Sequence, residues 1–316
     1  MPLKSVGFVG FLLLLIAFWF TGEFFGITAK LGEVPAATAA SFVLLLAPYW
    51  FFGWGLAGPL KRVLKTPLTR IAGSTVFVVP YLVFSIPRAE FRIGLCAELL
   101  IAIVGLTALL EYARGDWADY AALLAVALII ELHVFARAWP VPGLSGLEKL
   151  LFMDVVLYLY LVVRTSVQVG FDLRARASDF RVGLREFLYY TPIALALGFA
   201  MGFLHLHRIT SSAQWIGAGW IFTLFFVALP EEIFFRGLLL NLLEKRIGTK
   251  AALVVSAVVF GLAHFNKRAN VFNWRYVILA AIAGIFYGRS YLANRRILSA
   301  GVTHATVDTV WSIWLR

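Results

Sequence analysis

Three ionisable side chains stand close together inside a long apolar segment of this chain. Glu231, Glu232 and Arg236 lie within residues 213–244, which are otherwise rich in Phe, Leu, Ile and Val. If this segment is a helix, Glu232 and Arg236 lie four residues apart on one face and can form an ion pair. Glu231 is turned about 100° away from Glu232. The spacing therefore predicts one structural carboxylate, Glu232, and one carboxylate that is available for chemistry, Glu231.

Two histidines stand inside the apolar segments that follow. His264 comes four residues after Phe260, and Asp308 comes four residues after His304, so each pair shares a helix face. At 1.5 Å per residue, Glu231 and His264 lie roughly 21 Å from the basic residues that bound their helices, and His304 and Asp308 lie roughly 12 and 18 Å from theirs. If the helices alternate in direction, these distances start from one membrane face. The sequence thus predicts that the four groups approach one layer.

These residue types could together hydrolyse a peptide bond. A carboxylate in apolar surroundings is a competent proton acceptor near neutral pH, which suits Glu231. With His264 it would hold and deprotonate a water molecule. His304 would lie opposite and donate a hydrogen bond to the carbonyl oxygen as negative charge develops there. Asp308 would help by fixing the tautomer of His304 or, if protonated, by donating a hydrogen bond itself.

Two other interpretations of the same residues stay open. Glu231, His264 and His304 would satisfy the ligand list of a catalytic zinc ion. The sequence has no His-Glu-x-x-His pattern, and pairing of Glu232 with Arg236 leaves fewer free ligands, so metal-free hydrolysis is favoured and no cofactor is expected. The residues could instead only hold helices together. Each charged group inside a membrane helix costs about 2.5 to 3.5 kcal/mol, however, which favours a functional role for the set.

The composition requires a membrane around these helices. Hydrophobic residues make up 61% of the 316 residues and charged residues 14%, against roughly a quarter in soluble domains. Repeated apolar stretches predict an all-α, polytopic bundle of about 11 transmembrane helices, within a range of about 9 to 12. The basic residues behind the net charge of +11 lie in short loops, which indicates an anionic lipid surface as the partner and argues against nucleic acid. The predicted spans are residues 6–27, 36–58, 71–87, 93–111, 119–136, 148–164, 187–206, 213–243, 250–265, 276–292 and 297–315.

A polar interval between Arg164 and Arg185 separates two parts of the chain. We place the boundary after residue 180, so that residues 1–180 form an N-terminal transmembrane bundle with no assigned role and residues 181–316 hold every motif. The larger share of Lys and Arg falls on the side that the N-terminus occupies. This bias predicts a cytoplasmic N-terminus, and we expect a multi-pass protein of the bacterial cytoplasmic membrane.

The three motifs resemble those of the CAAX protease and bacteriocin-processing family of membrane proteins, also called the abortive-infection family. In chain order they are Glu231-Glu232-x-x-x-Arg236, Phe260-x-x-x-His264 and His304-x-x-x-Asp308. The resemblance covers roughly residues 185–316. It implies a glutamic-type intramembrane endopeptidase with a water-filled cavity, in which the first Glu and both His carry out proteolysis. The candidate catalytic residues are Glu231, His264, His304 and Asp308, and the candidate supporting residues are Glu232, Arg236 and Phe260.

We therefore expect an endopeptidase that acts near the C-terminus of a membrane-tethered protein or peptide. Whether the substrate tail is prenylated or is a C-terminal sorting segment stays open. A non-catalytic membrane scaffold or immunity protein of the same family is the first alternative. A proton-coupled transporter is the second, with Glu98, Glu131 and Asp154 as its ionisable residues. Two symmetric halves with Gly- or Pro-broken helices, which would favour transport, do not occur in the sequence.

Overall fold

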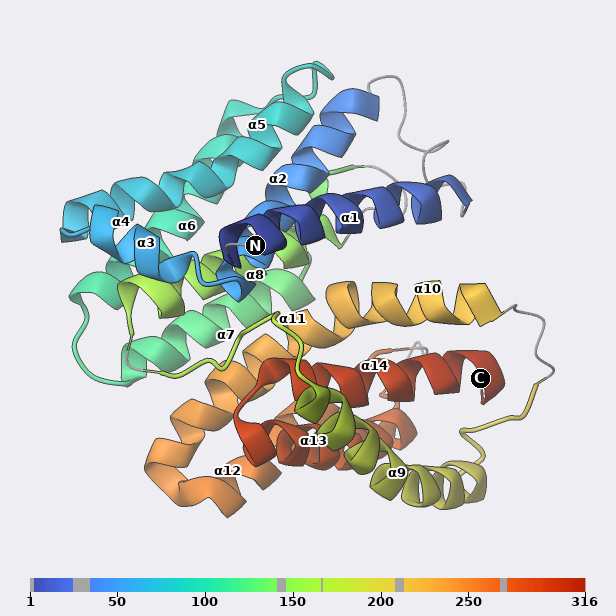
Figure 1. Ribbon diagram of the computed structural model, residues 1–316. Coiled ribbons are helices and arrows are strands. Elements are labelled where there is room, and N and C mark those ends of the chain that lie inside the picture. The colour runs from blue at the N-terminus through green and yellow to red at the C-terminus, as the bar shows by residue number, and fades with distance from the viewer. Residues whose placement is uncertain are drawn as a thin grey trace. The chain divides into compact units, whose positions relative to one another are not determined.

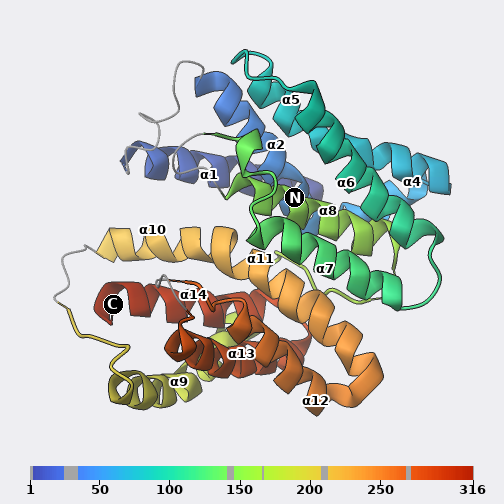
Figure 2. The same cartoon turned by 180° about the vertical axis from the view of Figure 1, so that it is seen from behind.

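The computed structural model describes residues 3–24, 35–140, 146–165, 167–207, 213–267 and 272–315. Within these ranges the chain forms helices joined by turns and loops, without a strand (Figure 1), and Figure 2 shows the same helices from behind. The chain folds as two compact units, Met1–Ser166 and Val167–Arg316. The predicted all-α class is therefore confirmed.

The second unit begins earlier in the chain than residue 180, where the sequence analysis places its boundary. The segment that precedes α9 packs with the second unit. For example, the backbone N–H of Ile297 donates to the carbonyl oxygen of Gly170 over 2.9 Å. This polar segment therefore helps to hold the helices that carry the motifs.

The first unit is built around a helix that is buried on nearly every side. This helix is α8 (Leu147–Tyr158), and the π-helical turn η4 (Leu159–Val163) continues it. The elements of this unit besides α8 and η4 are α1 (Leu3–Phe24), α2 (Pro35–Gly53), α3 (Ala57–Val63), α4 (Pro67–Ser74), η2 (Thr75–Val78), α5 (Val79–Ser85), α6 (Ile93–Tyr112), α7 (Trp117–Glu131) and η3 (Ala136–Ala138). A helix with so few exposed positions as α8 needs neighbours all round: α2, α7, η2 and η3 contact α8, and α3 and α6 contact η4.

The second unit carries all three motifs. Its elements are α9 (Ala177–Ala200), α10 (Ala213–Thr223), η5 (Leu224–Ala228), α11 (Leu229–Glu232), η6 (Ile233–Leu240), α12 (Asn241–Leu262), α13 (Trp274–Asn294) and α14 (Ile297–Trp314). The regular helix that the sequence predicts over residues 213–244 is interrupted, because η5 and η6 are π-helical turns. Such wide turns are rare and occur often at functional sites. Here they lie directly before and after α11, which ends in the two adjacent glutamates.

The described residues include five stretches that are long and apolar enough to cross a membrane. They are Ala36–Gly53, Pro67–Ser85, Ile93–Tyr112, Trp215–Leu262 and Trp274–Asn294. Each predicted span overlaps a helix, and these stretches fit a helical membrane bundle. The predicted spans 213–243 and 250–265 both lie in the longest stretch. Gly248 divides them, because its φ of +77° is left-handed and breaks the helix there.

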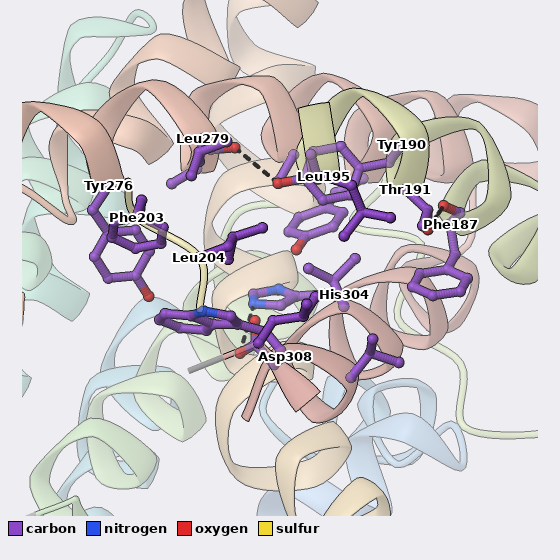
Figure 3. Close-up of a pocket in the computed structure, with 18 of the residues that line it drawn as sticks. Phe187, Tyr190, Thr191, Leu195, Phe203, Leu204, Tyr276, Leu279, His304 and Asp308 are labelled. Atoms are coloured by element: carbon purple, nitrogen blue, oxygen red, sulfur yellow. Dashed lines mark hydrogen bonds and ion pairs between the residues drawn. The ribbon is translucent and has the colours of Figure 1, made fainter. Parts of the chain in front are cut away.

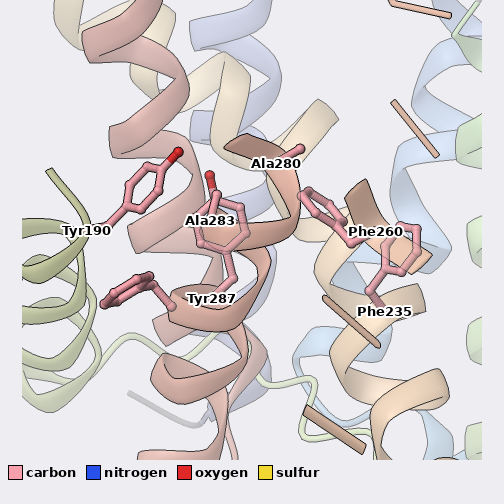
Figure 4. Packing of buried hydrophobic residues seen from close by; sticks show 7 residues of the cluster. Tyr190, Phe235, Phe260, Ala280, Ala283 and Tyr287 are labelled. Carbon is pink, nitrogen blue, oxygen red and sulfur yellow. The ribbon is translucent and has the colours of Figure 1, made fainter. Parts of the chain in front are cut away.

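Aromatic and small residues together form the core beside the motifs (Figure 4). The Phe260 ring meets the rings of Phe235 and Tyr287 edge-on, at centroid distances of 5.0 and 5.7 Å. Close approach of α12 to α13 depends on Gly261, where a Cβ would lie only 2.5 Å from the carbonyl oxygen of Val277. Small residues at helix contacts commonly allow such packing in membranes. The buried members of this cluster are Tyr190, Phe235, Phe260, Ala280, Ala283, Phe286 and Tyr287.

Arg296 fastens the start of α14 to the segment around the start of α9. Its guanidinium donates to both carboxylate oxygens of Asp179 (2.7 and 3.0 Å), to Asp172 (2.9 Å) and to the carbonyl oxygen of Arg174 (2.7 Å). Asp179 is fully buried and also accepts from the backbone N–H of Arg176 over 2.9 Å. Buried charges are stable only when they are paired. The network therefore fixes the position of α14 against α9.

The Asp172 carboxyl gives a test of this network, because it lies in a loop outside the membrane spans. Burial raises its pKa, but hydrogen bonds from Arg174 and Arg296 outweigh burial and lower the pKa from 3.8 to about 2. A carboxyl group whose pKa is lower in the folded than in the unfolded protein stabilises the fold at pH values above its unfolded-state pKa. This contribution is lost as the pH falls through the folded-state pKa. We expect Asp172→Asn to lower the free energy of unfolding by about 1 kcal/mol at neutral pH, less than the full shift implies because solvent screens a partly exposed group. The difference from the wild type should vanish between about pH 4 and about pH 2.

Chemical unfolding in detergent micelles at a series of pH values measures this difference. Glu131→Gln, at an exposed position in the first unit, is the matched control and should leave the free energy of unfolding unchanged. A deficit in Asp172→Asn that persists at about pH 2 would show that the carboxyl does not act through its charge.

Candidate active site

His304 lies at the centre of the ionisable residues in the second unit. It comes from α14, its side chain is 3% exposed, and both ring nitrogens face carboxylates. Nδ1 lies 2.8 Å from Oε1 of Glu232. The same Oε1 also accepts a hydrogen bond from the Arg236 guanidinium, so it acts as an acceptor here. Nδ1 of His304 therefore carries a proton and donates a hydrogen bond to Glu232, which fixes the orientation of the ring.

Glu232 and Arg236 form the ion pair that their spacing predicts. Nη1 of Arg236 donates to Oε1 of Glu232 over 3.1 Å, and Nη2 donates to the carbonyl oxygen of Gly284 on α13 over 3.0 Å. Both side chains are fully buried. The guanidinium also lies over the Phe260 ring, 4.5 Å from its centroid, which favours a cation in this position. The pair thus connects α11 and η6 with α12, α13 and, through His304, with α14.

Nε2 of His304 faces two further carboxylates. Oδ2 of Asp308, one turn further along α14, lies 3.5 Å away, and Oε2 of Glu231 lies 3.9 Å away. Both distances are longer than a typical hydrogen bond. The side chains of Glu231 and Asp308 are 19% and 32% exposed, whereas Glu232 is fully buried. The two partly accessible carboxylates can therefore reach a water molecule or a substrate, and Glu232 cannot.

His264, at the end of α12, is oriented by the backbone of its own helix. Its Nδ1 lies 2.8 Å from the carbonyl oxygen of Phe260, so Nδ1 donates and Nε2 remains outside this bond. The His264 ring contacts the rings of Phe260 and Tyr276, at 4.7 and 5.0 Å between centroids. Phe260 also meets the His304 ring edge-on at 5.7 Å. One aromatic side chain therefore contacts both histidines.

His264, His304 and Asp308 line one pocket of about 80 Å³ (Figure 3). A space of this size has room for several water molecules. Glu231 is not among the residues that line the pocket. Its Oε2 lies 3.9 Å from Nε2 of His304, which does line the pocket. The wall is largely apolar, with aliphatic and aromatic side chains from α9, α12, α13, α14 and the segment after α9. Its aromatic residues besides Phe260 are Phe187, Tyr190, Phe203, Tyr276, Tyr287 and Trp311.

Two tyrosines of this wall were missed by the sequence analysis. Tyr287 stacks on His304 with 4.5 Å between ring centroids and 15° between the planes. The Tyr190 hydroxyl donates to the carbonyl oxygen of Leu279 over 3.2 Å, as the dashed line in Figure 3 marks. Aromatic residues make up 16% of the chain, so residue type alone does not distinguish these two from the rest. Neither belongs to a motif with recognisable spacing.

The donors for the alternative zinc site, Glu231, His264 and His304, do not form a ligand set. Across the described ranges, no group of three or more His, Cys, Asp and Glu side chains has the arrangement to hold a metal ion. His304 uses Nδ1 for Glu232, and His264 uses Nδ1 for the Phe260 carbonyl. Metal-free chemistry remains a prediction, which analysis of the purified protein can test.

Two ionisable residues of the first unit, Glu98 and His133, have charged partners of their own. Glu98 forms an ion pair with Arg137, and His133 Nδ1 lies 2.8 Å from the buried carboxylate of Glu148. Asp154 is buried on α8. Pairing and packing therefore account for Glu98 and His133 without a second active site.

Comparison with known proteins concerns the second unit. No curated protein and no solved structure matches the chain. Residues 213–310 match a family model described as type II CAAX prenyl endopeptidase Rce1-like. This segment contains all three motifs and is shorter than the region of roughly 185–316 over which the motifs suggest a resemblance. The predicted family resemblance is therefore confirmed, and residues 213–310 are similar to the Rce1-like type II CAAX prenyl endopeptidases.

Proposed function

We propose that this protein is an intramembrane endopeptidase that cuts near the C-terminus of a membrane-tethered protein. One observation carries the proposal: three helices that are distant in sequence bring the motif residues together. His264, His304 and Asp308 line one pocket, and Glu231 lies 3.9 Å from His304. The family match over residues 213–310 supports an endopeptidase in general, and the apolar helices support a membrane location.

Glu231 is the proposed general base. It accepts a proton from a water molecule, whose oxygen then bonds to the carbonyl carbon of the scissile peptide. Nε2 of His264 orients this water, since Nδ1 is held by the backbone. When the C–N bond breaks, Glu231 passes the proton to the leaving nitrogen. The products are a new carboxyl terminus and a new amino terminus.

His304 is proposed to stabilise the charge that develops on the carbonyl oxygen. A donor at Nε2 requires a ring that is protonated at both nitrogens, and such a cation has Glu232 at one side and Asp308 and Glu231 at the other. A fixed donor aimed at developing charge is commonly worth about 100- to 1,000-fold in rate. Glu232 would take over the orienting role that the sequence analysis gave to Asp308, because Glu232 makes the shorter contact.

The proposed substrate is a membrane-tethered protein or peptide with an apolar C-terminal tail. The largely apolar wall of the pocket suits apolar side chains better than charged ones. A prenylated tail and a transmembrane sorting tail both satisfy this chemistry. The proposed setting is the bacterial cytoplasmic membrane, with the N-terminus in the cytoplasm and with residues 1–180 in a role that is still unassigned.

The first test removes the proposed base and its partner. Glu231→Gln and His264→Ala should each reduce cleavage about 100- to 10,000-fold, because each removes a proton acceptor or a water ligand while keeping the helix. The assay follows release of a C-terminal fragment from a membrane-tethered reporter in liposomes that contain the purified protein.

Matched controls are Glu131→Gln and His205→Ala, at exposed positions, and both should cleave at the wild-type rate. Normal cleavage by both Glu231→Gln and His264→Ala would contradict the proposal. If a variant that carries both Glu231→Gln and His264→Ala also restores the phenotype of a deletion strain, the protein acts instead as a scaffold or immunity protein.

The second test concerns metal. The purified, active protein should contain far less than one zinc ion per chain, and cleavage should persist after treatment with a strong chelator, because the described donors do not converge on one ion. Elemental analysis and the reporter assay measure the two quantities. Stoichiometric zinc, with activity lost on chelation and restored by zinc, would contradict metal-free hydrolysis.

A further inference from the structure

α9 has an exposed face on which arginines and apolar side chains occur together. Its buried positions recur at helical spacing and pack against α13 and α14. On the opposite face Phe180, Leu184 and Leu188 are 40%, 46% and 65% exposed. Arg181 and Arg185 are exposed between them. In a membrane protein, apolar side chains on such a face contact lipid, and the long arginine side chains extend toward the headgroups.

Two arginines from neighbouring helices meet at one buried carboxylate beside this face. Arg185 of α9 donates to Oε1 of Glu186 (3.1 and 2.8 Å), and Arg289 of α13 donates to Oε2 (2.7 Å). Glu186 is 1% exposed, whereas the two arginines are 48% and 47% exposed. One carboxylate thus neutralises one of two guanidinium groups, which leaves a net charge of +1 at the surface.

Aromatic contacts hold the second guanidinium in place. Arg289 lies over the rings of Phe286 and Tyr189, 5.4 and 5.9 Å from their centroids, and uses only Nε for Glu186. Its outer nitrogens are therefore positioned but not occupied by that ion pair. Arg181, one turn before Arg185 on α9, adds a further positive charge and forms no ion pair with any residue that the structure describes. A fixed, planar guanidinium with outward N–H groups matches the geometry of a phosphate.

The position of this cluster along the helices agrees with the headgroup region of a bilayer. Arg289 lies five residues before Asn294, the end of the apolar stretch Trp274–Asn294. This separation corresponds to about 8 Å along the helix, whereas the centre of a hydrocarbon core lies about 15 Å from its edge. The arginine side chain is long enough to reach the phosphate layer from such a depth.

We propose that Arg181, Arg185 and Arg289 bind the phosphate of an anionic phospholipid, whose acyl chain lies along Phe180, Leu184 and Leu188. Basic clusters between membrane helices are recurrent sites for anionic headgroups. The adjacent apolar face gives the lipid a second contact that a free phosphate ion would not use. This binding site is independent of the proposed protease chemistry and involves none of its residues.

Native mass spectrometry of the full-length protein with added lipids tests the proposal. The wild type should retain phosphatidylglycerol or cardiolipin about tenfold more strongly than phosphatidylcholine. The variant Arg185→Gln/Glu186→Gln/Arg289→Gln removes both guanidinium groups without leaving a buried charge unpaired, and it should lose this preference. Arg62→Gln, at an exposed position in the first unit, changes the net charge by the same amount and should keep it.

Arg181→Gln keeps the test decisive if the triple variant does not fold, because Arg181 is exposed and has no ion pair to lose. It should weaken retention of the anionic lipid about fivefold, the effect expected for one basic residue at a membrane surface. Wild-type retention in either variant, or no preference in the wild type, would overturn the proposal. Displacement of the lipid by inorganic phosphate alone would also overturn it and assign the cluster to the free ion.

Discussion

The buried carboxylate of Glu232 is the interaction on which the second unit depends. Its Oε1 faces two donors, Nη1 of Arg236 and Nδ1 of His304, and the side chain has no exposure to solvent. A charge in such surroundings is very costly without partners and becomes tolerable only when several hydrogen bonds surround it. The fold must therefore bring α11, η6 and α14 together at this point. The Gly284 carbonyl on α13 and the Phe260 ring on α12 complete the surroundings of the same ion pair.

This constraint explains why two adjacent glutamates differ in their surroundings. Glu232 points into the core and holds His304, whereas Glu231 is partly exposed and reaches only the far nitrogen of that ring. The π-helical turns η5 and η6 lie directly before and after α11, and the two adjacent glutamates at its end lie about 100° apart around the helix. Nδ1 of the His304 ring is therefore held by Glu232, and its Nε2 faces the two partly exposed carboxylates of Glu231 and Asp308. Such a fixed donor is what electrostatic stabilisation of a transition state requires.

Much of this organisation could be predicted from the sequence, because it rests on local spacing. The four-residue separations predict the Glu232–Arg236 pair and the contact of His304 with Asp308, and apolar runs predict the helices. The link from Glu232 to His304 joins residues 72 positions apart, and no local pattern encodes it. The π-helical turns likewise depend on packing rather than on residue preference. For the same reason the stacking of Tyr287 on His304 becomes visible only in the structure.

The most direct test of the central claim is a double-mutant cycle between Glu232 and His304. The free energy of unfolding in mixed micelles would be measured for the wild type, Glu232→Gln, His304→Gln and the double variant. A buried hydrogen bond to a charged group predicts a coupling energy of about 1.5 to 3 kcal/mol, so the double variant should be much less destabilised than the sum of the single variants. Additive effects, with a coupling energy within about 0.5 kcal/mol of zero, would contradict the account, because the two side chains would then not depend on one another.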